Sequence, residues 1–289
     1  MPEPTPQSGQ LSSTVGRIGK LTLEYARRGM QTVLIRSNCH TPWHLLPPIY
    51  LDGTGSSYTL LLNPSGGLVG GDRLTLDIRL KPKTHVIVST PGANRVYRSL
   101  SKISAHIVHM TVEHGGVLEW IPDLMIPFAG SRFRQVIHVT LARGATLFLW
   151  DAMASGRVAS GERWAFHSLE NEIRITTASK TFLLDRYRLT GGNTNEIGLA
   201  RKWDYVGSFY MIGDAIEEAR WKGLEENLGE IGDGCRDRIL MGVSEPSVQG
   251  RVVRLLTTSA PDLNAILHKI WTAARAQLLG LPVPALRRY

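Results

Sequence analysis

Apolar and polar residues alternate along much of the chain between Leu21 and Leu189. In the clearest case, Leu74, Leu76, Ile78 and Leu80 are separated by polar residues, which is the pattern of a strand with one buried face. Such alternation, or a short apolar run, predicts strands at residues 21–25, 32–36, 60–62, 74–80, 85–89, 105–113, 117–120, 135–141, 145–150, 172–177 and 181–184. Helical periodicity is nearly absent here, so this region predicts a mainly-β fold.

Most of these strands come in pairs that are joined by a short turn. The segments Gly115-Gly-Val-Leu-Glu-Trp120 and Gly144-Ala-Thr-Leu-Phe-Leu-Trp150 end about 30 residues apart, so one unit resembles the next. Repeated hairpins at this spacing favour stacked strand layers, arranged either as a β-sandwich or as a β-solenoid.

The last third of the chain predicts about two α-helices among three further strands, at residues 203–212, 238–243 and 251–257. Asp214 and Glu217 form a candidate capping pair for a helix that runs to Leu228 and stops at Gly229. Ser259 starts the clearest helix, whose apolar positions repeat at helical spacing and are Leu263, Ile266, Leu267, Ile270, Trp271, Ala274 and Leu278. Gly280 and Pro282 end it. We expect the tail 284–289 to be exposed, so that Leu281, Val283 and Leu286 would form an apolar docking strip if they lie on the surface.

A glycine-rich segment lies between two of the predicted strands. It contains Gly66, Gly67, Gly70 and Gly71, and it follows Asn63-Pro64, which ends the preceding strand. A phosphate-binding loop would need a Gly-Lys-Ser/Thr sequence, or a Gly-x-Gly-x-x-Gly sequence before a helix, and neither is present. We therefore interpret the segment as a tight structural turn between two buried strands.

Composition narrows the class of protein. The chain has 289 residues, 43% hydrophobic residues and a net charge of +8, which fits a folded protein attracted to acidic surfaces. No basic run is interleaved with aromatic residues, and no apolar run approaches the ~20 residues of a membrane span, so we expect neither nucleic acid nor membrane as a partner. Two cysteines and a polar, proline-rich start predict a cytoplasmic protein without a signal peptide. We expect residues 1–18 to form a disordered tail and residues 19–289 to form a single domain.

Two groups of residues are candidates for chemistry. Cys39, His40 and His44 are thiol and imidazole groups that suit nickel or zinc, but a second ligand pair is missing and the prolines of this loop can hold them apart. Carboxylates also stand beside hydrophobic strand ends, namely Asp72, Glu119, Asp123, Asp151, Glu162 and Asp185. Each is a solvated charge, an acid/base group with a shifted pKa, or an oxygen ligand for a divalent ion. Arg95, Arg98, Arg157 and Arg163 are possible ion-pair partners.

Several blocks of the sequence resemble the family of the urease accessory protein UreD, called UreH in some organisms. The long segment Asn63-Pro-Ser-Gly-Gly-Leu-Val-Gly-Gly-Asp-Arg-Leu74 is similar to the family's loop, and Arg95-Val-Tyr-Arg-Ser99 is similar to the next block. Further similar blocks follow in family order, at Leu118–Pro122, Ile126–Gly130, Trp150-Asp151, Gly156–Glu162 and Asp185-Arg186. The resemblance is strong over residues 21–189. In the last third of the chain only the order of the predicted elements is similar. Its structural residues here are Asn63, Pro64, Gly66, Gly67, Gly70, Gly71, Arg73, Tyr97 and Arg98.

The resemblance implies a maturation chaperone that is not an enzyme. Such a protein binds apo-urease and the accessory proteins UreF and UreG, of which UreG is the GTPase, and helps to deliver nickel to urease. It also implies a mainly-β fold with helices towards the C-terminus. No tightly bound cofactor is expected, only transient Ni²⁺, and transfer requires weak sites. On this basis the candidates for the nickel route are Asp72, Glu119, Asp123, Glu162 and Asp185.

The sequence departs from the family pattern at three places, which leaves alternatives open. Pro122-Asp-Leu-Met125 replaces Pro-Gln-Glu-Thr, Trp150-Asp151 replaces Trp-Glu, and Pro91-Gly-Ala-Asn94 replaces Gln-Ala-Ala-Thr. The first two changes keep a carboxylate but alter its reach, and the third alters the path of a loop. One alternative is an enzyme or binding module that acts on carbohydrate through paired carboxylates ~5–10 Å apart. Another is a purely structural partner of UreF without metal contact.

Overall fold

The computed structural model describes residues 16–177, 180–191 and 202–286. Strands are the main element of secondary structure, as the alternation predicts. The strands are β1 Ile18–Arg28, β2 Gln31–Cys39, β3 His44–Leu45, β4 Ser57–Leu62, β5 Arg73–Leu80, β6 His85–Ser89, β7 Asn94–Val96, β8 Ser104–Val112, β9 Val117–Trp120, β10 Met125–Pro127, β11 Arg132–Leu141, β12 Thr146–Ala154, β13 Ser168–Thr176, β14 Thr181–Thr190, β15 Tyr205–Gly213, β16 Ile239–Ser244 and β17 Gly250–Thr257. The helices are α1 Glu218–Asp233 and α2 Ala260–Ala274, with a 3₁₀ turn Val158–Ser160 and a π-helical turn Arg275–Leu279.

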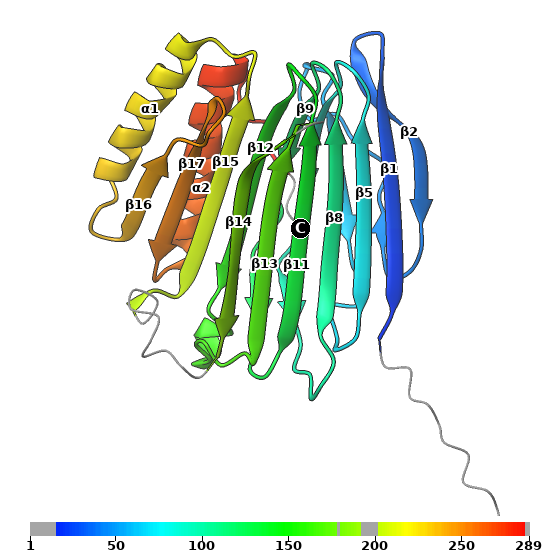
Figure 1. Ribbon diagram of the computed structural model, residues 1–289, viewed down its shortest axis with the longest axis vertical. Helices are drawn as coiled ribbons and strands as arrows, with labels where there is room; N and C mark the ends of the chain where they lie inside the picture. Colours follow the sequence, from blue (N-terminus) through cyan, green and yellow to red (C-terminus); the bar gives the residue numbers. More distant parts are fainter. Residues whose placement is uncertain (1–15, 178–179, 192–201, 287–289) are drawn as a thin grey trace, which may run out of the picture.

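Within these residues the strands form two sheets that stack face to face (Figure 1). The seven-stranded sheet has the order β14-β13-β11-β8-β5-β1-β2. The larger sheet has the order β16-β17-β15-β12-β9-β6-β4-β3, with β7 and β10 attached beside β12. From β5 to β13 the chain passes alternately from one sheet to the other, and neighbours such as β5 and β8, or β6 and β9, are parallel. This winding is that of a β-solenoid, one of the two arrangements that the repeats predict.

The predicted pairing within most units is wrong, although the strands are present. The turn at 81–84 does not close a hairpin, because β5 belongs to the seven-stranded sheet and β6 to the larger one. The turns after β8 and β11 cross between the sheets in the same way. Alternation shows that one face of a strand is buried but not which strand lies beside it. Two of the predicted units do form antiparallel hairpins. They are β1 with β2 at the start of the chain, and β13 with β14.

Two apolar cores hold three layers together. One core lies between the two sheets and contains inward residues such as Leu76, Val108 and Ile137. The other lies between the larger sheet and the two helices, where Trp150 and Trp271 pack edge to face. The central strands of the larger sheet are therefore buried on both faces, which explains the nearly continuous apolar run of β12.

Helix α2 begins as predicted, and helix α1 does not. The cap expected for α2 is present, since the Ser259 hydroxyl accepts the Asp262 N–H at 3.2 Å. Helix α1 starts at Glu218 and continues through Gly229 to Asp233, so the expected stop is wrong. Its expected capping pair is also wrong, because the Asp214 carboxylate accepts the N–H of Gly144 instead.

The C-terminal segment is less exposed than predicted. Pro284 is buried, and Val283 and Leu286 pack partly against the core beneath the helices, so they do not form a free apolar strip. Residues 287–289 lie outside the described residues, as does the part of the predicted N-terminal tail before Gly16. Strand β1 begins at Ile18, which the sequence analysis assigned to the tail. No described helix combines the length and apolar character needed to cross a lipid bilayer.

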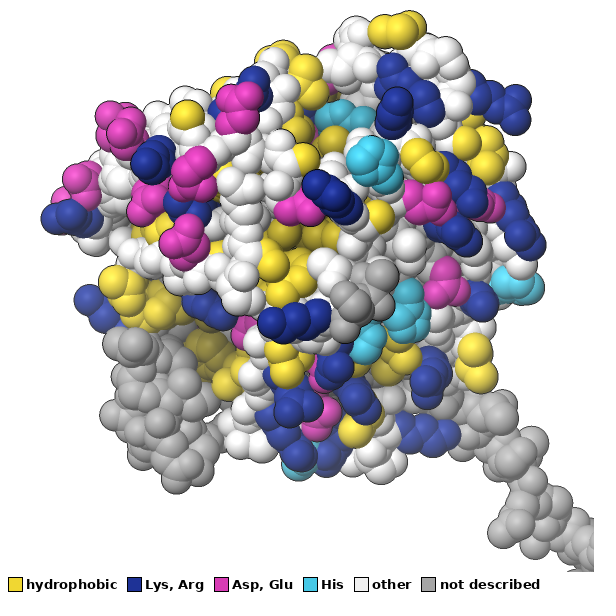
Figure 2. All heavy atoms as spheres, turned by 45° about the horizontal axis from the view of Figure 1, so that its top comes forward, with side chains coloured by type: hydrophobic (Ala, Val, Ile, Leu, Met, Phe, Trp, Pro, Cys, Tyr) yellow, Lys and Arg dark blue, Asp and Glu magenta, His cyan; other side chains and the backbone are white. Residues whose placement is uncertain are grey.

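Charge is distributed unevenly over the surface. Figure 2 shows acidic side chains gathered over α1, and basic side chains gathered over the outer face of the seven-stranded sheet. On that sheet, the cations pair with two carboxylates of β13: Arg134 and Arg188 lie against Glu170, and Arg174 and Arg186 lie against Glu172. This face therefore keeps an excess of positive charge.

Candidate functional site

The glycine-rich segment is a packed corner that joins β4 of the larger sheet to β5 of the other. Leu68 is fully buried, and its N–H donates to the Arg95 carbonyl at 2.7 Å while its carbonyl accepts the Tyr97 N–H at 2.8 Å. At Gly67 a Cβ atom would lie 2.4 Å from the Arg95 carbonyl oxygen, so only glycine fits. The segment serves as a tight turn, as predicted.

Asp72 holds this corner from within. Its carboxylate accepts the backbone N–H of Val69 at 2.8 Å and that of Arg17 at 2.7 Å, and it is almost fully buried. Both acceptor oxygens are thus engaged with the backbone. Among the candidates for the nickel route, Asp72 has the clearest structural task.

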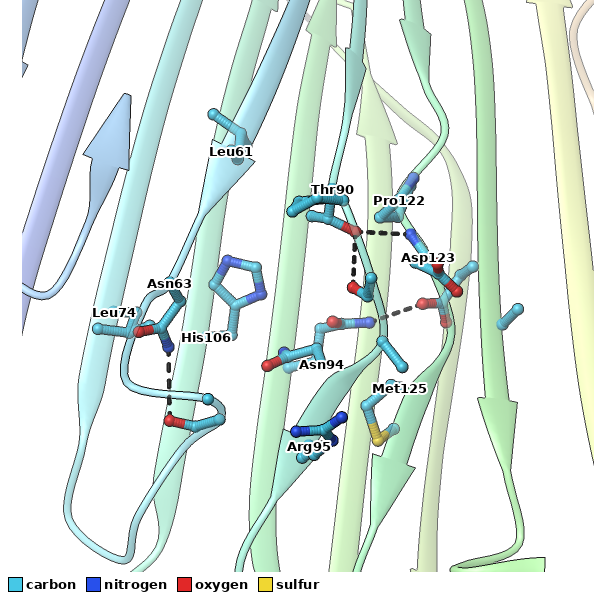
Figure 3. A pocket seen from close by; sticks show the side chains of 18 of the residues that line it. Leu61, Asn63, Leu74, Thr90, Asn94, Arg95, His106, Pro122, Asp123 and Met125 are labelled. Atoms are coloured by element: carbon cyan, nitrogen blue, oxygen red, sulfur yellow. Dashed lines mark hydrogen bonds between the residues drawn. The ribbon is translucent and has the colours of Figure 1, made fainter. Parts of the chain in front are cut away.

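A cavity of about 220 Å³ lies beside the corner, between the two sheets (Figure 3). Gly66 and Gly67 form part of its wall, and the 90–95 loop forms another part. The polar residues that line it include Asn63, Thr90, Asn94, Arg95, His106, Asp123, Gln135 and Asp151. It has room for several water molecules, which makes it suitable for a hydrated ion or a very small molecule.

Two carboxylates come together at this cavity. Asp123 lies on the loop before β10, where Thr90 accepts its N–H at 2.8 Å. Asp151 lies on β12 and accepts the Gln135 amide at 2.8 Å and the Asn171 amide at 2.8 Å. Burial raises the pKa of Asp151, although these two hydrogen bonds oppose the shift. Asp123 is one of the predicted candidates for the nickel route. Asp151 is one of the strand-end carboxylates of the sequence analysis but is not among those candidates.

Asp151 belongs to a row of inward-facing polar side chains at one level of the stack, which we call the polar layer. On the seven-stranded sheet, pairing places His106 beside Gln135, Gln135 beside Asn171, and Asn171 beside Tyr187. On the larger sheet, Asp151 pairs with Ser208, which pairs with Arg254. The interior of the sandwich is mainly apolar, so this layer interrupts the core.

The far end of the polar layer reaches Asp185, another predicted candidate. Its carboxylate accepts the Tyr210 hydroxyl and lies 2.8 Å from the Arg254 guanidinium. Burial raises the pKa of both Tyr187 and Tyr210, and the nearby Asp151 and Asp185 raise each further. Asp185, Tyr210 and Arg254 line a second hollow of about 230 Å³ at the edge of β14. The polar layer therefore connects two cavities.

His106 contributes an uncharged imidazole to the first cavity. Its side chain is 9% exposed, its Nε2 has no hydrogen-bond partner among the described residues, and its ring packs near Trp43. Burial lowers the pKa of His106 to about 4, so the ring is neutral at physiological pH. A neutral imidazole with a free nitrogen is both a hydrogen-bond partner and a metal ligand.

Glu119 lies on the opposite face of the larger sheet, away from this cavity. It is fully buried and accepts hydrogen bonds from His85, Trp271 and Arg275. Arg275 is fully buried too and also lies 3.5 Å from Asp52. These contacts tie β9 to α2 and the π-helical turn that follows it.

Glu162 is not part of the polar layer. It forms an ion pair with Arg157 and accepts the Ala129 N–H at 3.2 Å. The hydrogen bond from Arg157 lowers the pKa of Glu162. The structure thus brings Asp123 into the cavity and Asp185 to the far end of the polar layer, while Asp72, Glu119 and Glu162 lie elsewhere.

The Cys39, His40 and His44 group is not assembled into a site. The Cys39 thiol donates a hydrogen bond to the Trp43 carbonyl at 3.2 Å, and desolvation raises the pKa of that thiol. Throughout the part of the chain that the structure describes, no three His, Cys, Asp or Glu side chains lie close enough to hold a metal ion together.

Sequence reasoning missed most of the polar layer. His106, Gln135 and Asn171 occupy inward positions of three strands whose other inward residues are mostly apolar. A polar residue recurring at an inward position in successive units is the signal that could have identified them. The signal becomes clear only when the units are aligned as coils of a solenoid.

The chain is similar in sequence to one family of known proteins. The family model for the UreD urease accessory protein matches residues 17–289. Urease accessory protein UreD 2 of Streptomyces griseus is 32% identical, over 94% of each chain. Urease accessory protein UreD of Cupriavidus metallidurans is 29% identical over 96% of each chain. Urease accessory protein UreD of a Picosynechococcus strain is 33% identical over 75% of this chain and 76% of its own.

Proposed function

Because the chain belongs to the UreD urease accessory protein family, we propose that it is a scaffold for urease maturation and catalyses no reaction. In this proposal it works in the cytoplasm, binds apo-urease together with UreF and UreG, and conducts Ni²⁺ towards the urease active site. The names of its relatives support the role in maturation. The partners and the nickel transfer are the proposal itself.

The observation that carries the nickel proposal is the polar layer with a cavity at each end. Burying polar groups between two sheets costs stability unless they are paired, so such a row across an apolar core needs a reason. Oxygen and nitrogen donors such as Asp151, Gln135 and His106 suit Ni²⁺. Since these donors are spread along the row, each holds an ion weakly and releases it to the next.

In this mechanism the candidate carboxylates have different tasks. Asp123 and Asp151 attract the cation at the first cavity, and Asp185 attracts it at the second. Burial raises the pKa of Asp151 because it disfavours the charged carboxylate. A cation in the cavity offsets this cost, so it stabilises the charged form of Asp151 most. Asp72, Glu119 and Glu162 instead hold the corner, the helix layer and a surface loop.

The test removes the charge in the first cavity with substitutions of nearly equal shape, and thermal unfolding of the variant chain checks that it still folds. Asp123→Asn and Asp151→Asn are combined in the chain, which is expressed with its cognate urease and the other accessory proteins. We expect urease activity and urease nickel content to fall at least tenfold, because the cavity loses both negative charges. The matched control is Glu170→Gln on the outer face of β13, which should change neither by more than about twofold.

Two results would contradict this function. Normal nickel content in urease matured with the double variant would remove the polar layer from nickel transfer. Turnover of a carbohydrate by the purified chain would favour the alternative of an enzyme with paired carboxylates.

A further inference from the structure

Two histidine side chains lie next to each other on the outer face of the seven-stranded sheet. His109 of β8 and His138 of β11 are directly opposite in the parallel pairing, and their ring centroids are 5.8 Å apart. Both strands lie in the middle of this sheet (Figure 1). The two side chains are 49% and 38% exposed, so solvent reaches both rings. The polar layer lies on the other face of the sheet, so the histidine pair is separate from it.

A carboxylate flanks each ring on the side away from the other ring. Asp77 of β5 lies 3.2 Å from Nδ1 of His109, and Glu172 of β13 lies 3.0 Å from Nε2 of His138. The strand order β13-β11-β8-β5 therefore gives a row of Glu172, His138, His109 and Asp77. Each ring keeps a second nitrogen, Nε2 of His109 and Nδ1 of His138, that forms no hydrogen bond with the described residues.

This arrangement is the one that metal-binding histidines adopt. A histidine that binds a metal usually donates its other ring N–H to a carboxylate, which fixes the tautomer and orients the ring. Here both rings have such a carboxylate. Because a metal–imidazole bond is about 2.1 Å long, an ion between two rings whose centroids are 5.8 Å apart reaches a nitrogen of each after a small rotation of the exposed side chains.

The surroundings of the pair determine which ion it suits and how tightly. No third His, Cys, Asp or Glu side chain among the described residues completes a ligand set, so water fills the remaining positions. Lys20 lies 3.4 Å from Asp77, and Arg174 lies 3.0 Å from Glu172, so positive charge nearby opposes a cation. Imidazole ligands favour Ni²⁺, Cu²⁺ and Zn²⁺ over Mg²⁺ and Ca²⁺, which prefer oxygen. The site therefore suits a loosely held, exchangeable transition-metal ion.

We propose that His109 and His138 form a surface site that chelates one divalent transition-metal ion, with Asp77 and Glu172 as positioning residues. A bound ion joins β8 to β11 and so links two neighbouring coils of the solenoid. The inference does not rest on the proposed function, because the site lies outside the polar layer and binds metal whether or not the chain conducts nickel.

The experiment titrates the purified full-length chain, prepared without a histidine tag, with Ni²⁺ and separately with Zn²⁺ in a calorimeter. It is done at about pH 7.5, because imidazole binds a metal only when it is deprotonated. We expect His109→Ala and His138→Ala each to weaken binding at this site at least tenfold. The double variant should lose little more than either single variant, because a chelate is lost with its first ligand.

The positioning residues give a second readout, since they do not touch the metal. Asp77→Asn should weaken binding about tenfold, because the His109 ring loses the carboxylate that orients it. The matched control is Glu170→Gln on the same face, where the carboxylate pairs with Arg134 and Arg188 and with no histidine. This control should bind the metal as the unaltered chain does.

Two further controls separate this site from other groups of the chain. His40→Ala with His44→Ala removes two exposed histidines elsewhere and should leave the affinity unchanged. Asp123→Asn with Asp151→Asn removes the charge of the first cavity and should leave this site occupied. Thermal unfolding midpoints of the metal-free histidine variants should lie within about 3 °C of the unaltered chain, because the substitutions are on the surface.

Two outcomes would overturn the proposal. Equal affinity in the unaltered chain and in the double histidine variant would mean that the two rings only stack and pair with their carboxylates. Binding to the unaltered chain only above about 1 mM metal would be adventitious. If urease matures normally with the Asp123 and Asp151 variant while the histidine pair binds metal as expected, the proposed nickel route fails and this site stands.

Discussion

At the scale of single residues, His106 shows how the interior sets the charge state of a side chain. The imidazole is enclosed between the sheets, and desolvation disfavours its protonated form. Since the pKa in the folded chain is about 4 and the ordinary value is 6.5, the unfolded chain takes up a proton first as the pH falls. With His106 neutral, the free energy of unfolding has its full value above pH 6.5. It falls as the pH decreases from 6.5 towards 4, because the unfolded chain then binds a proton that the folded chain does not.

This shift predicts a pH-dependent stability. Between about pH 7.5 and pH 4.5, the unaltered chain should lose about 2–3 kcal/mol of unfolding free energy more than His106→Gln, which cannot be protonated. Denaturant unfolding at several pH values measures the difference. Parallel curves for the two proteins would show that His106 is not desolvated as described.

Gly67 predicts a second effect at this scale. Its φ is +155° and a Cβ atom would lie 2.4 Å from the Arg95 carbonyl oxygen, so Gly67→Ala must displace the backbone. We expect about 2 kcal/mol of destabilisation, seen as a thermal midpoint lower by about 5 °C. Gly242→Ala is the control, because nothing lies within 4 Å of that position. Equal midpoints for both variants would contradict the packing of the corner.

At the scale of elements, the buried pair of Glu119 and Arg275 connects the larger sheet to the helix layer. Arg275→Met should cost about 3–5 kcal/mol, since it leaves a buried carboxylate uncompensated. Adding Glu119→Gln removes that charge, so the double variant should recover part of the loss. A double-mutant cycle by chemical unfolding measures the coupling. Additive losses would mean that the two side chains do not act as a pair.

The strands and α2 could be predicted because local rules decide them. Alternation defines strands such as β5, and Ser259 caps α2 in the way its position indicates. Helix α1 differs because tertiary contacts override the local signal. Asp214 is drawn to Gly144, and the helix continues through Gly229 while Trp221, Leu224 and Leu228 are buried against the larger sheet.

At the scale of the whole molecule, the sequence did not predict which strand lies beside which. The polar layer and its cavities depend on this arrangement of neighbouring strands. Asp123 and Asp185 were identified because carboxylates near apolar strands are conspicuous in a sequence. Glu119 has the same local setting, but its side chain faces the helices and not the cavity. Which face of a strand meets which layer follows from the winding of the chain, and so does the polar layer.

The two antiparallel hairpins at the ends of the seven-stranded sheet have a consequence for behaviour in solution. A pile of parallel coils with bare end strands would be a template for further copies and could polymerise into filaments. Here β2 and β14 reverse direction at the two ends, and the outermost strand β14 carries Arg186 and Arg188. Because the antiparallel strands at both ends do not continue the parallel coils, the stack has a fixed length, and we expect the charged β14 edge to disfavour pairing with another copy.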